Sequence, residues 1–360
     1  MTRPLRVLLD GTPLLGHRTG IGRYTSALAE ELASMPDEVE MRAVAFTLRG
    51  WRALRTVLPH GVRARGLPVS ARFLRQCWLR APFPPVEMLT GFTDVMHGTN
   101  FVLPPTIRAG GVTTIHDLAF LDAPDTLPLS DRRLPELVRQ SAHRADVVCT
   151  PTRAVAQTVE ERLGIAADKI VVTPLGVDPS WFASQPPNEA LRAKLRLPSE
   201  YVLFVGAGGP RKGLDALLAA HKAEQALPPL VLAGPRESRV DGRVLRTGYL
   251  SDVDLRSVVA GASVLVLPSR DEGFGLPVLE ALACNVPVVC SDVPALREVA
   301  GGHATLVPVG DVEALGRAMF EAVEAPPNPT AQVARRTHAA TFTWRRTAEI
   351  TVEAYRRAAN

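Results

Sequence analysis

The chain has 360 residues, of which 46% are hydrophobic and 22% are charged, and its formal net charge is +4. This composition excludes an intrinsically disordered chain, and the length predicts two domains, each with its own core. The apolar stretches are far shorter than the roughly 20 residues of a membrane span. The N-terminus enters a strand-like segment without a secretory signal, and the four widely spaced cysteines form no CxxC pattern. We therefore expect a cytoplasmic protein.

Short β-rich segments alternate with amphipathic helical patterns along the chain. The strand-like segments are 5–10, 39–46, 94–98, 111–117, 146–152 and 169–177 in the first half, then 201–207, 229–234, 262–269, 286–292 and 304–310 in the second. Helices are expected over 20–35, 153–164, 212–227, 251–261, 276–284, 294–300 and 311–325. Nearly continuous apolar strands are typical of parallel sheets covered on both faces, so the pattern predicts an α/β protein with two doubly wound domains.

The domain boundary is expected where this alternation breaks. Residues 176–198 contain four prolines and show no apolar period. We expect a first domain at 1–185 and a second at 186–340. The remaining segment, 341–360, contains the pattern of an amphipathic helix.

Positive charge is concentrated in one window of the first half. Residues 41–86 contain nine arginines and no acidic residue. Trp51, Phe73 and Trp78 are interleaved with these arginines. The window is either an ordinary solvated surface or a patch that attracts an anionic membrane or an acidic substrate. Nucleic acid is not expected as a partner, because no nucleic-acid-binding motif accompanies the window.

The strongest chemical signal is SRDEGFGLPVLEAL, residues 269–282. A strand ends before it and a helix begins near Leu276, which leaves Glu272 in the loop and Glu280 about one turn into the helix. Such a helix start binds anions, Gly275 allows a ligand to approach the backbone, and the two carboxylates suit hydroxyl groups. The segment therefore indicates a ligand with phosphate and polyol character. The alternative is a capping Glu272 and a solvated Glu280.

A second glycine-rich segment, FVGAGGPRKGLDALLAA at 204–220, also follows a strand. Arg211 and Lys212 lie just before its helix, where adjacent cations favour phosphate. The segment is neither a Walker loop nor a GxGxxG fingerprint, so by itself it also fits an ordinary surface pair. Both segments, however, follow strands of the same half, and open α/β sheets bind ligands at the carboxyl ends of their strands.

Strand ends of the first half carry further candidates. His116 follows a buried strand and is expected to hydrogen-bond a reacting sugar, with a structural pairing to the next aspartate as the alternative. Gly20 and Gly22 lie at a helix start after the first strand, without the third glycine of a nicotinamide site. His97 and Asn100 occupy another strand-end loop.

Asp252 and Asp254 form a D-x-D pattern, a spacing that can hold a metal on a diphosphate. They follow Ser251 at the start of a predicted helix, where acidic residues are favoured by the helix dipole. We therefore expect capping and no metal site.

Together these segments resemble family 4 glycosyltransferases of the GT-B fold, in particular bacterial mannosyltransferase-like members, over nearly the whole chain. The resemblance is carried by TGIGRY (19–24), IHDLAFL (115–121), VVTPLGVDPSWF (171–182), PRKG (210–213), GYLSDVDLRSVVAGASVLVLPS (248–269) and EGFGLPVLEALACNVPVV (272–289). Glu272 and Glu280 match the family's E-x7-E motif. One departure is Ala207, where many members have an arginine after the glycine that Gly206 matches.

The resemblance implies two facing Rossmann-like domains with a cleft between them, and a last helix that returns to the N-terminal domain. It also implies a sugar nucleotide in the cleft and transfer with retention of anomeric configuration, without a metal or other cofactor. Arg211 and Lys212 would hold the donor diphosphate, Glu280 the ribose and Glu272 the donor sugar. The other donor-binding positions would be Gly20, Gly22, Tyr249, Leu250, Phe274, Gly275 and Leu276.

We therefore expect a retaining hexosyltransferase of polysaccharide biosynthesis with His116 and Glu272 as catalytic residues and His97 and Asn100 on the acceptor side. GDP-mannose is favoured as donor by resemblance, and the acceptor would be a glycan, a lipid-linked acceptor or a small molecule. The 41–86 window would hold the enzyme peripherally on the inner face of the membrane. The alternatives are a sugar-nucleotide 2-epimerase of the same fold and a catalytically silent nucleotide-binding subunit.

Overall fold

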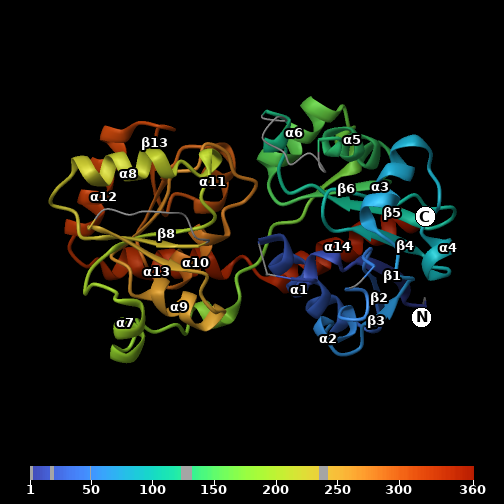
Figure 1. Ribbon diagram of the computed structural model, residues 1–360, viewed down its shortest axis with the longest axis horizontal. Coiled ribbons are helices and arrows are strands. Elements are labelled where there is room, and N and C mark those ends of the chain that lie inside the picture. Colours follow the sequence, from blue (N-terminus) through green and yellow to red (C-terminus); the bar gives the residue numbers. More distant parts are fainter. Residues whose placement is uncertain (1–2, 17–19, 49, 123–131, 235–241) are drawn as a thin grey trace. The chain divides into compact units, whose positions relative to one another are not determined.

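The computed structural model describes residues 3–16, 20–48, 50–122, 132–234 and 242–360 (Figure 1). The chain forms two compact α/β units: unit 1 is Met1–Gly176 with Trp344–Asn360, and unit 2 is Val177–Thr343. The chain thus enters unit 2 at Val177, earlier than the expected boundary at 185/186. The proline-rich segment belongs to unit 2 because the Val177 N–H donates to the Phe342 carbonyl and the Trp181 carbonyl accepts from the Cys284 thiol.

Unit 1 contains a seven-stranded parallel sheet in the order β3-β2-β1-β4-β5-β6-β7. Its strands are β1 (Leu5–Asp10), β2 (Val39–Val44), β3 (Arg63–Arg65), β4 (Val95–Gly98), β5 (Gly110–Thr114), β6 (Val147–Thr150) and β7 (Ile170–Val172). Its helices are α1 (Gly20–Ala33), α2 (Leu54–Val57), α3 (Ala71–Arg80), α4 (Glu87–Thr90), α5 (Leu134–Arg144), α6 (Arg153–Leu163) and α14 (Trp344–Ala359). Figure 1 shows α1 and α14 on one face of the sheet and α3 and α5 on the other.

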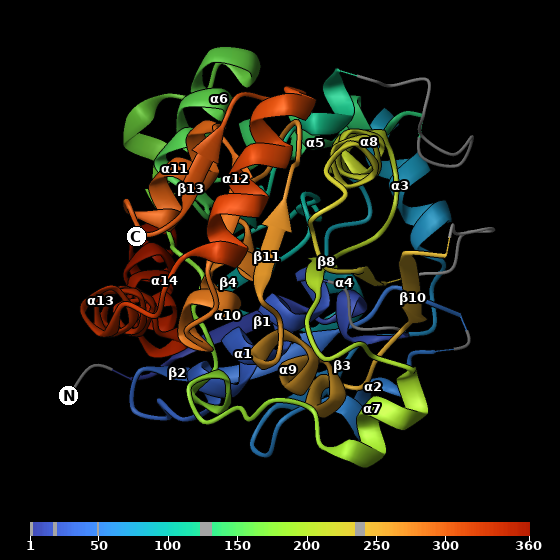
Figure 2. The same cartoon turned by 90° about the vertical axis from the view of Figure 1, so that its left-hand side faces the viewer.

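Unit 2 contains a six-stranded parallel sheet in the order β10-β9-β8-β11-β12-β13. Its strands are β8 (Val202–Val205), β9 (Leu230–Ala233), β10 (Val244–Gly248), β11 (Val264–Leu267), β12 (Val288–Ser291) and β13 (Thr305–Val307). Its helices are α7 (Glu189–Leu195), α8 (Leu214–Ala223), α9 (Asp252–Ala260), α10 (Leu276–Ala283), α11 (Pro294–Ala300), α12 (Val312–Glu324) and α13 (Pro329–Ala340). Figure 2 shows β8 beside β11 at the centre of this sheet.

Both sheets are doubly wound, which confirms the fold class expected from the apolar strands. In each sheet the strand order reverses at one point, between β1 and β4 in unit 1 and between β8 and β11 in unit 2. Such reversal points leave a crevice at the carboxyl ends of the two strands, where doubly wound domains bind ligands. The topology therefore predicts ligand sites in the segments that follow these four strands.

Several elements lack a clear sequence signal. The short edge strand β3 has an exposed arginine at each end, so it shows no buried apolar run. Strand β10 is only half-buried throughout. Helix α13 begins at Pro329 inside a proline cluster, because the Asn328 side chain accepts from the Ala331 N–H and proline is tolerated in the first turn of a helix.

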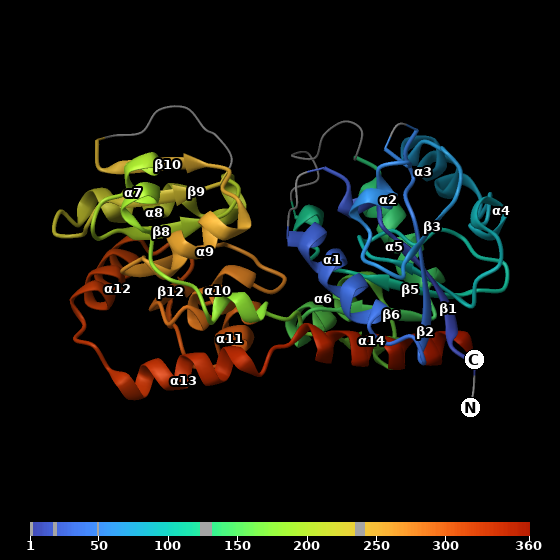
Figure 3. The same ribbon diagram turned by 90° about the horizontal axis from the view of Figure 1, so that it is seen from below.

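The C-terminal helix α14 packs against the sheet of unit 1 (Figure 3). A Cβ atom at Gly110 would lie 2.0 Å from the Ala358 carbonyl oxygen, so only glycine permits this approach to β5. A buried polar chain connects helix and sheet: His97 Nδ1 lies 2.8 Å from the Tyr355 hydroxyl, and His97 Nε2 lies 2.8 Å from Thr114 Oγ1. Among the described residues, none of the helices combines the length and apolarity that a membrane crossing requires.

We predict that His97 makes unit 1 sensitive to mild acid. Burial, with a smaller effect of nearby His116, lowers the pKa of His97 from 6.5 to about 3, so the folded state keeps this ring neutral while the unfolded chain protonates it. Stability should therefore be full above about pH 6.5 and fall below it, by up to roughly 1.4 kcal/mol per pH unit. Urea unfolding of the wild type and His97→Gln between about pH 7 and pH 5 should show a shallower pH dependence in the variant. His60→Gln, at an exposed side chain, is the control; equal pH dependence of His97→Gln and wild type would contradict the prediction.

Candidate functional site

The two segments with the strongest chemical signal follow the two central strands of unit 2. The first runs from Gly206 through a short helical turn, Pro210–Lys212, into α8. The second runs from Pro268 to Gly275 between β11 and α10. Because β8 and β11 are adjacent and parallel, both segments emerge at the same edge of the sheet. We call them the donor loops.

The donor loops touch through their backbones. Gly213 has a φ of +63°, and a Cβ atom there would lie 2.0 Å from the Pro268 carbonyl oxygen. The Arg270 N–H donates to the Arg211 carbonyl at 2.8 Å. A third strand end joins them, because a Cβ atom at Gly234, after β9, would lie 2.0 Å from the Gly206 carbonyl oxygen. Glycine is thus required where these loops approach one another.

Glu272 lies at the centre of this arrangement. Its Oε1 atom is 2.5 Å from Lys212 Nζ and accepts a 2.7 Å hydrogen bond from Ser269 Oγ. Its Oε2 atom is 3.8 Å from Arg211 Nη1. The Glu272 side chain is 8% exposed and Ser269 is fully buried, so the carboxylate is largely shielded from water, whereas the Arg211 side chain is 40% exposed. The site gathers two cations and one carboxylate from different loops, an arrangement that sequence spacing alone did not show.

The start of α10 completes this part of the site. Gly275 caps the helix with a φ of +98°, and the ring of Phe274 contacts that of Phe342 with 6.0 Å between centroids. Leu276 is the first helical residue. Glu280 is only 1% exposed, which excludes the solvated helix position considered as an alternative. Burial of this carboxyl group within unit 2 was not expected from the sequence pattern.

The remaining expected donor residues lie at the end of β10. The Gly234 N–H donates to the Gly248 carbonyl at 3.2 Å, which brings the end of β10 beside the first donor loop. Tyr249 is 57% exposed and Leu250 is half-buried. Ser251 accepts from the Asp254 N–H at 3.1 Å, as the capping interpretation predicts, and Asp254 Oδ2 is 3.2 Å from Lys194 Nζ.

In unit 1, His116 lies at the end of β5 and is 8% exposed. Its Nε2 atom donates to the Thr99 carbonyl at 2.8 Å, and its ring contacts those of Tyr24 and Phe101 at centroid distances of 4.9 and 5.7 Å. Burial lowers the pKa of His116, and the Thr99 hydrogen bond and the charge of Asp117 oppose that effect only in part. The ring is therefore neutral at pH 7, with Nδ1 as its hydrogen-bond acceptor.

The two acceptor-side candidates differ in their surroundings. His97 is fully buried with both ring nitrogens hydrogen-bonded, so its placement favours a structural role in holding α14 over contact with a substrate. Asn100 lines a small cavity of about 40 Å³ together with Asp10, Arg75 and Trp78. Asp10 was not singled out from the sequence, and Arg75 was considered only as one of the nine arginines of the 41–86 window. The position of Asp10 at the end of the central strand β1 is the signal that could have identified it.

Gly20 and Gly22 form the start of α1, with Gly20 exposed and Gly22 buried. Thr19, the first residue of the TGIGRY segment, lies outside the described residues.

Two family models match this chain. Residues 19–176 match the model described as glycosyl transferase 4-like domain, and residues 199–325 match the model described as glycosyl transferases group 1. The O-antigen chain mannosyltransferase B of Escherichia coli is 29% identical, over 98% of this chain and 100% of that protein. The D-inositol 3-phosphate glycosyltransferase of Stackebrandtia nassauensis is 31% identical, over 74% of this chain and 68% of that protein.

A solved structure shows the same fold at lower sequence identity. Anabaena HepE in complex with UDP-glucose superposes with a TM-score of 0.70 at 17% identity, covering 97% of this chain and 98% of that one. Together with the two doubly wound sheets, these likenesses define a glycosyltransferase of the GT-B fold. The chain belongs to the family 4 glycosyltransferases, and the expected resemblance is confirmed.

We predict that Gly213→Ala destabilises unit 2 by separating the donor loops. Alanine at a positive φ costs about 1–2 kcal/mol by itself, and the Pro268 carbonyl leaves no room for a Cβ atom. Gly310→Ala is the matched control, since Gly310 has a φ of +79° and no atom within 4 Å of the added Cβ. Urea unfolding should show a clearly larger loss for Gly213→Ala; equal losses in the two variants would mean that the close approach has no energetic role.

Proposed function

We propose that this glycosyltransferase is a retaining, metal-independent hexosyltransferase that takes its sugar from a sugar nucleotide, with GDP-mannose as the donor. The observation that carries the proposal is the convergence of Lys212, Arg211 and the start of α10 around Glu272 at the reversal point of the unit 2 sheet. The favoured sugar rests on the likeness to the mannosyltransferase of Escherichia coli.

The charges of the donor loops suit the leaving group of such a reaction. Cleavage of the bond between sugar and phosphate leaves negative charge on the nucleoside diphosphate. Arg211 and Lys212 supply two cations, and the N–H groups at the start of α10 supply a positive dipole end. In the proposal these groups stabilise that charge, so the residues themselves can perform the task that a metal ion performs elsewhere.

The carboxylates suit the hydroxyl groups of the donor. Lys212 and Ser269 hold Glu272 through Oε1, and in the proposal Oε2 accepts hydrogen bonds from the hexose. Glu280, at the fifth position of α10, accepts from the ribose hydroxyls. In the proposal the donor site is further formed by the backbone of Phe274, Gly275 and Leu276, with Tyr249 or Leu250 beside the base.

Unit 1 is proposed to complete the reaction and to bind the acceptor. His116, held neutral with Nε2 donating to Thr99, can accept a hydrogen bond from a sugar hydroxyl through Nδ1. The cavity of about 40 Å³ beside Asp10, Arg75 and Asn100 has room only for a small group, and in the proposal these charged and amide side chains bind one hydroxyl group of the acceptor. Retention is proposed to proceed by attack on the face that the phosphate leaves, with a departing phosphate oxygen taking the acceptor proton.

The test is incubation with a panel of sugar nucleotides and mannose-containing acceptors, followed by NMR of the anomeric configuration of the product. GDP-mannose should give α-linked product, and excess EDTA should leave the rate unchanged. Lys212→Ala should lower kcat by roughly two orders of magnitude, the usual scale for one electrostatic donor. Isomerised nucleotide sugar would indicate an epimerase, and binding without turnover would indicate a silent subunit; either result, or an inverted product, contradicts the proposal.

The Glu280→Gln variant tests whether Glu280 binds the donor, without removing the side chain from the fold. Because Glu280 is buried, glutamine is preferred to alanine, which would open a cavity. Loss of charge-assisted hydrogen bonds to the ribose, worth roughly 1.5–3 kcal/mol each, should weaken donor binding about tenfold or more. Calorimetry with GDP measures this loss, and unfolding in urea reports whether the fold is intact. Unchanged affinity in a folded variant would remove Glu280 from the donor site.

We also propose that the surface of the 41–86 window binds anionic membrane. Arg52, Arg55, Arg63, Arg65, Arg72 and Arg80 are exposed, whereas Arg42 pairs with Glu40 and Arg49 lies outside the described residues. Phe73, beside Arg72 on α3, is 60% exposed. Trp78 does not belong to this surface: it is 3% exposed and donates to the Pro84 carbonyl within the core, which corrects the interface role expected for it.

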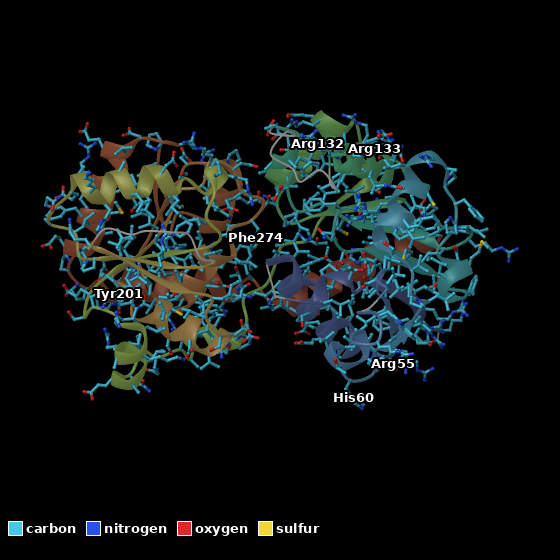
Figure 4. All side chains as sticks on the ribbon, in the orientation of Figure 1. Arg55, His60, Arg132, Arg133, Tyr201 and Phe274 are labelled. Carbon is cyan, nitrogen blue, oxygen red and sulfur yellow. The ribbon has the colours of Figure 1, made fainter. Side chains whose placement is uncertain are left out.

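Vesicle co-sedimentation tests this surface. Vesicles rich in phosphatidylglycerol should pellet the enzyme at low salt, less at high salt, and phosphatidylcholine vesicles should not. Arg52→Ser with Arg55→Ser should weaken pelleting, since each near-surface basic residue contributes about 1 kcal/mol. Arg132→Ser with Arg133→Ser is the control, because these exposed arginines lie at another margin of unit 1 (Figure 4). Equal loss in both double variants, or equal pelleting with both lipids, contradicts the proposal.

A further inference from the structure

Unit 2 contains a large cavity that the proposed reaction does not use. It has a volume of about 810 Å³ and lies between α12, the start of α13 and the amino ends of β12 and β13. Pro287 and Val288 line it before and within β12, and Ala304 and Thr305 line it at β13. The donor loops follow the carboxyl ends of the strands, so this cavity lies at the opposite edge of the same sheet. We call it the α13 cavity.

Arg335 contributes a positive charge to this cavity. It projects from α13, which packs alongside α10, and is half-buried. Its Nη2 atom donates to Asn285 Oδ1 at 3.3 Å, and its Nε–H is buried and forms no hydrogen bond within the described residues. Within those same residues no carboxylate lies within ion-pair distance of the guanidinium. A partly buried cation without a counter-charge favours the binding of an anionic ligand that supplies one.

The neighbouring groups also suit an anion. The first turn of α13, with Asn328, Ala331 and Gln332, lines the cavity and adds the positive end of a helix dipole. His303 lines it as well, and its ring lies 4.8 Å from that of His338, whose Nε2 donates to the Val299 carbonyl. Glu321, exposed on α12, is the acidic residue that lines the cavity.

We propose that the α13 cavity is a second ligand site, distinct from the donor site, which binds a small oxyanion bearing phosphate or carboxylate groups on Arg335. The bidentate geometry of a guanidinium matches both groups, since each presents two coplanar oxygen atoms. Asn285 and Gln332 supply amide groups beside the bound anion.

Calorimetric titration with pyrophosphate and, separately, with citrate tests the site and distinguishes the two anion classes. The wild type should bind at least one of them, and Arg335→Gln should weaken that binding about tenfold or more, the loss expected for a charge-assisted pair. Arg335→Lys keeps the charge without the planar guanidinium group, so its anion affinity should lie between those of the wild type and Arg335→Gln. Arg317→Gln is the control, since Arg317 is an exposed arginine of α12 that pairs with Glu313 outside the cavity.

Two further measurements separate this site from the donor loops and from a purely structural role. Lys212→Ala should retain the binding that Arg335→Gln loses. Without anion, Arg335→Gln should melt at the same temperature as the wild type or higher, because it removes an uncompensated charge. Anion affinity equal in wild type and Arg335→Gln would overturn the proposal. So would binding lost in Lys212→Ala alone, or a lower melting temperature of Arg335→Gln with unchanged affinity.

Discussion

The contact between Lys212 and Glu272 is the interaction on which the candidate site depends. It joins two loops that are 60 residues apart in sequence, and it does so beside the fully buried Ser269. Taking both charges out of water is costly, so the pair is maintained only because the loops hold the two groups in place. Gly213 permits that approach, and the Arg270 amide fixes it by donating to the Arg211 carbonyl. The charge arrangement of the site is therefore a consequence of backbone packing.

In unit 1, backbone packing likewise brings buried polar groups together, but these groups are neutral. The sheet presents Thr114 and His97 to α14, and Tyr355 and Tyr24 complete a chain of hydrogen bonds within a dry core. A buried network of this kind is favourable only when every polar atom in it has a partner. Its members come from α1, β4, β5 and α14, so the C-terminal helix has to dock on unit 1 for the core of that unit to be satisfied.

The two edges of the unit 2 sheet have different chemical characters. At the carboxyl edge, Glu272 balances the cations of the donor loops. At the amino edge, the Arg335 guanidinium faces the α13 cavity with an amide oxygen as its partner. Helix α10 spans the distance between them, since it begins beside Gly275 at the donor loops and ends just before Asn285 at the cavity. One short helix thus leads from the proposed donor site to Asn285, which lines the proposed anion site.

The sequence by itself determined the architecture and the residue types of the donor site. The period and the composition of a strand are local properties of the sequence. They therefore predict the buried parallel strands and the loops that contain Glu272, Glu280, Arg211 and Lys212. Elements without a local apolar signal, such as β3 and β10, were not predicted from the sequence. The tertiary structure, in contrast, determines which side chains contact one another. Only the fold decided that Glu272 pairs with Lys212, that Glu280 is buried, that Trp78 and His97 belong to the core, and that Arg335 faces a cavity, because each outcome depends on which distant segments pack together.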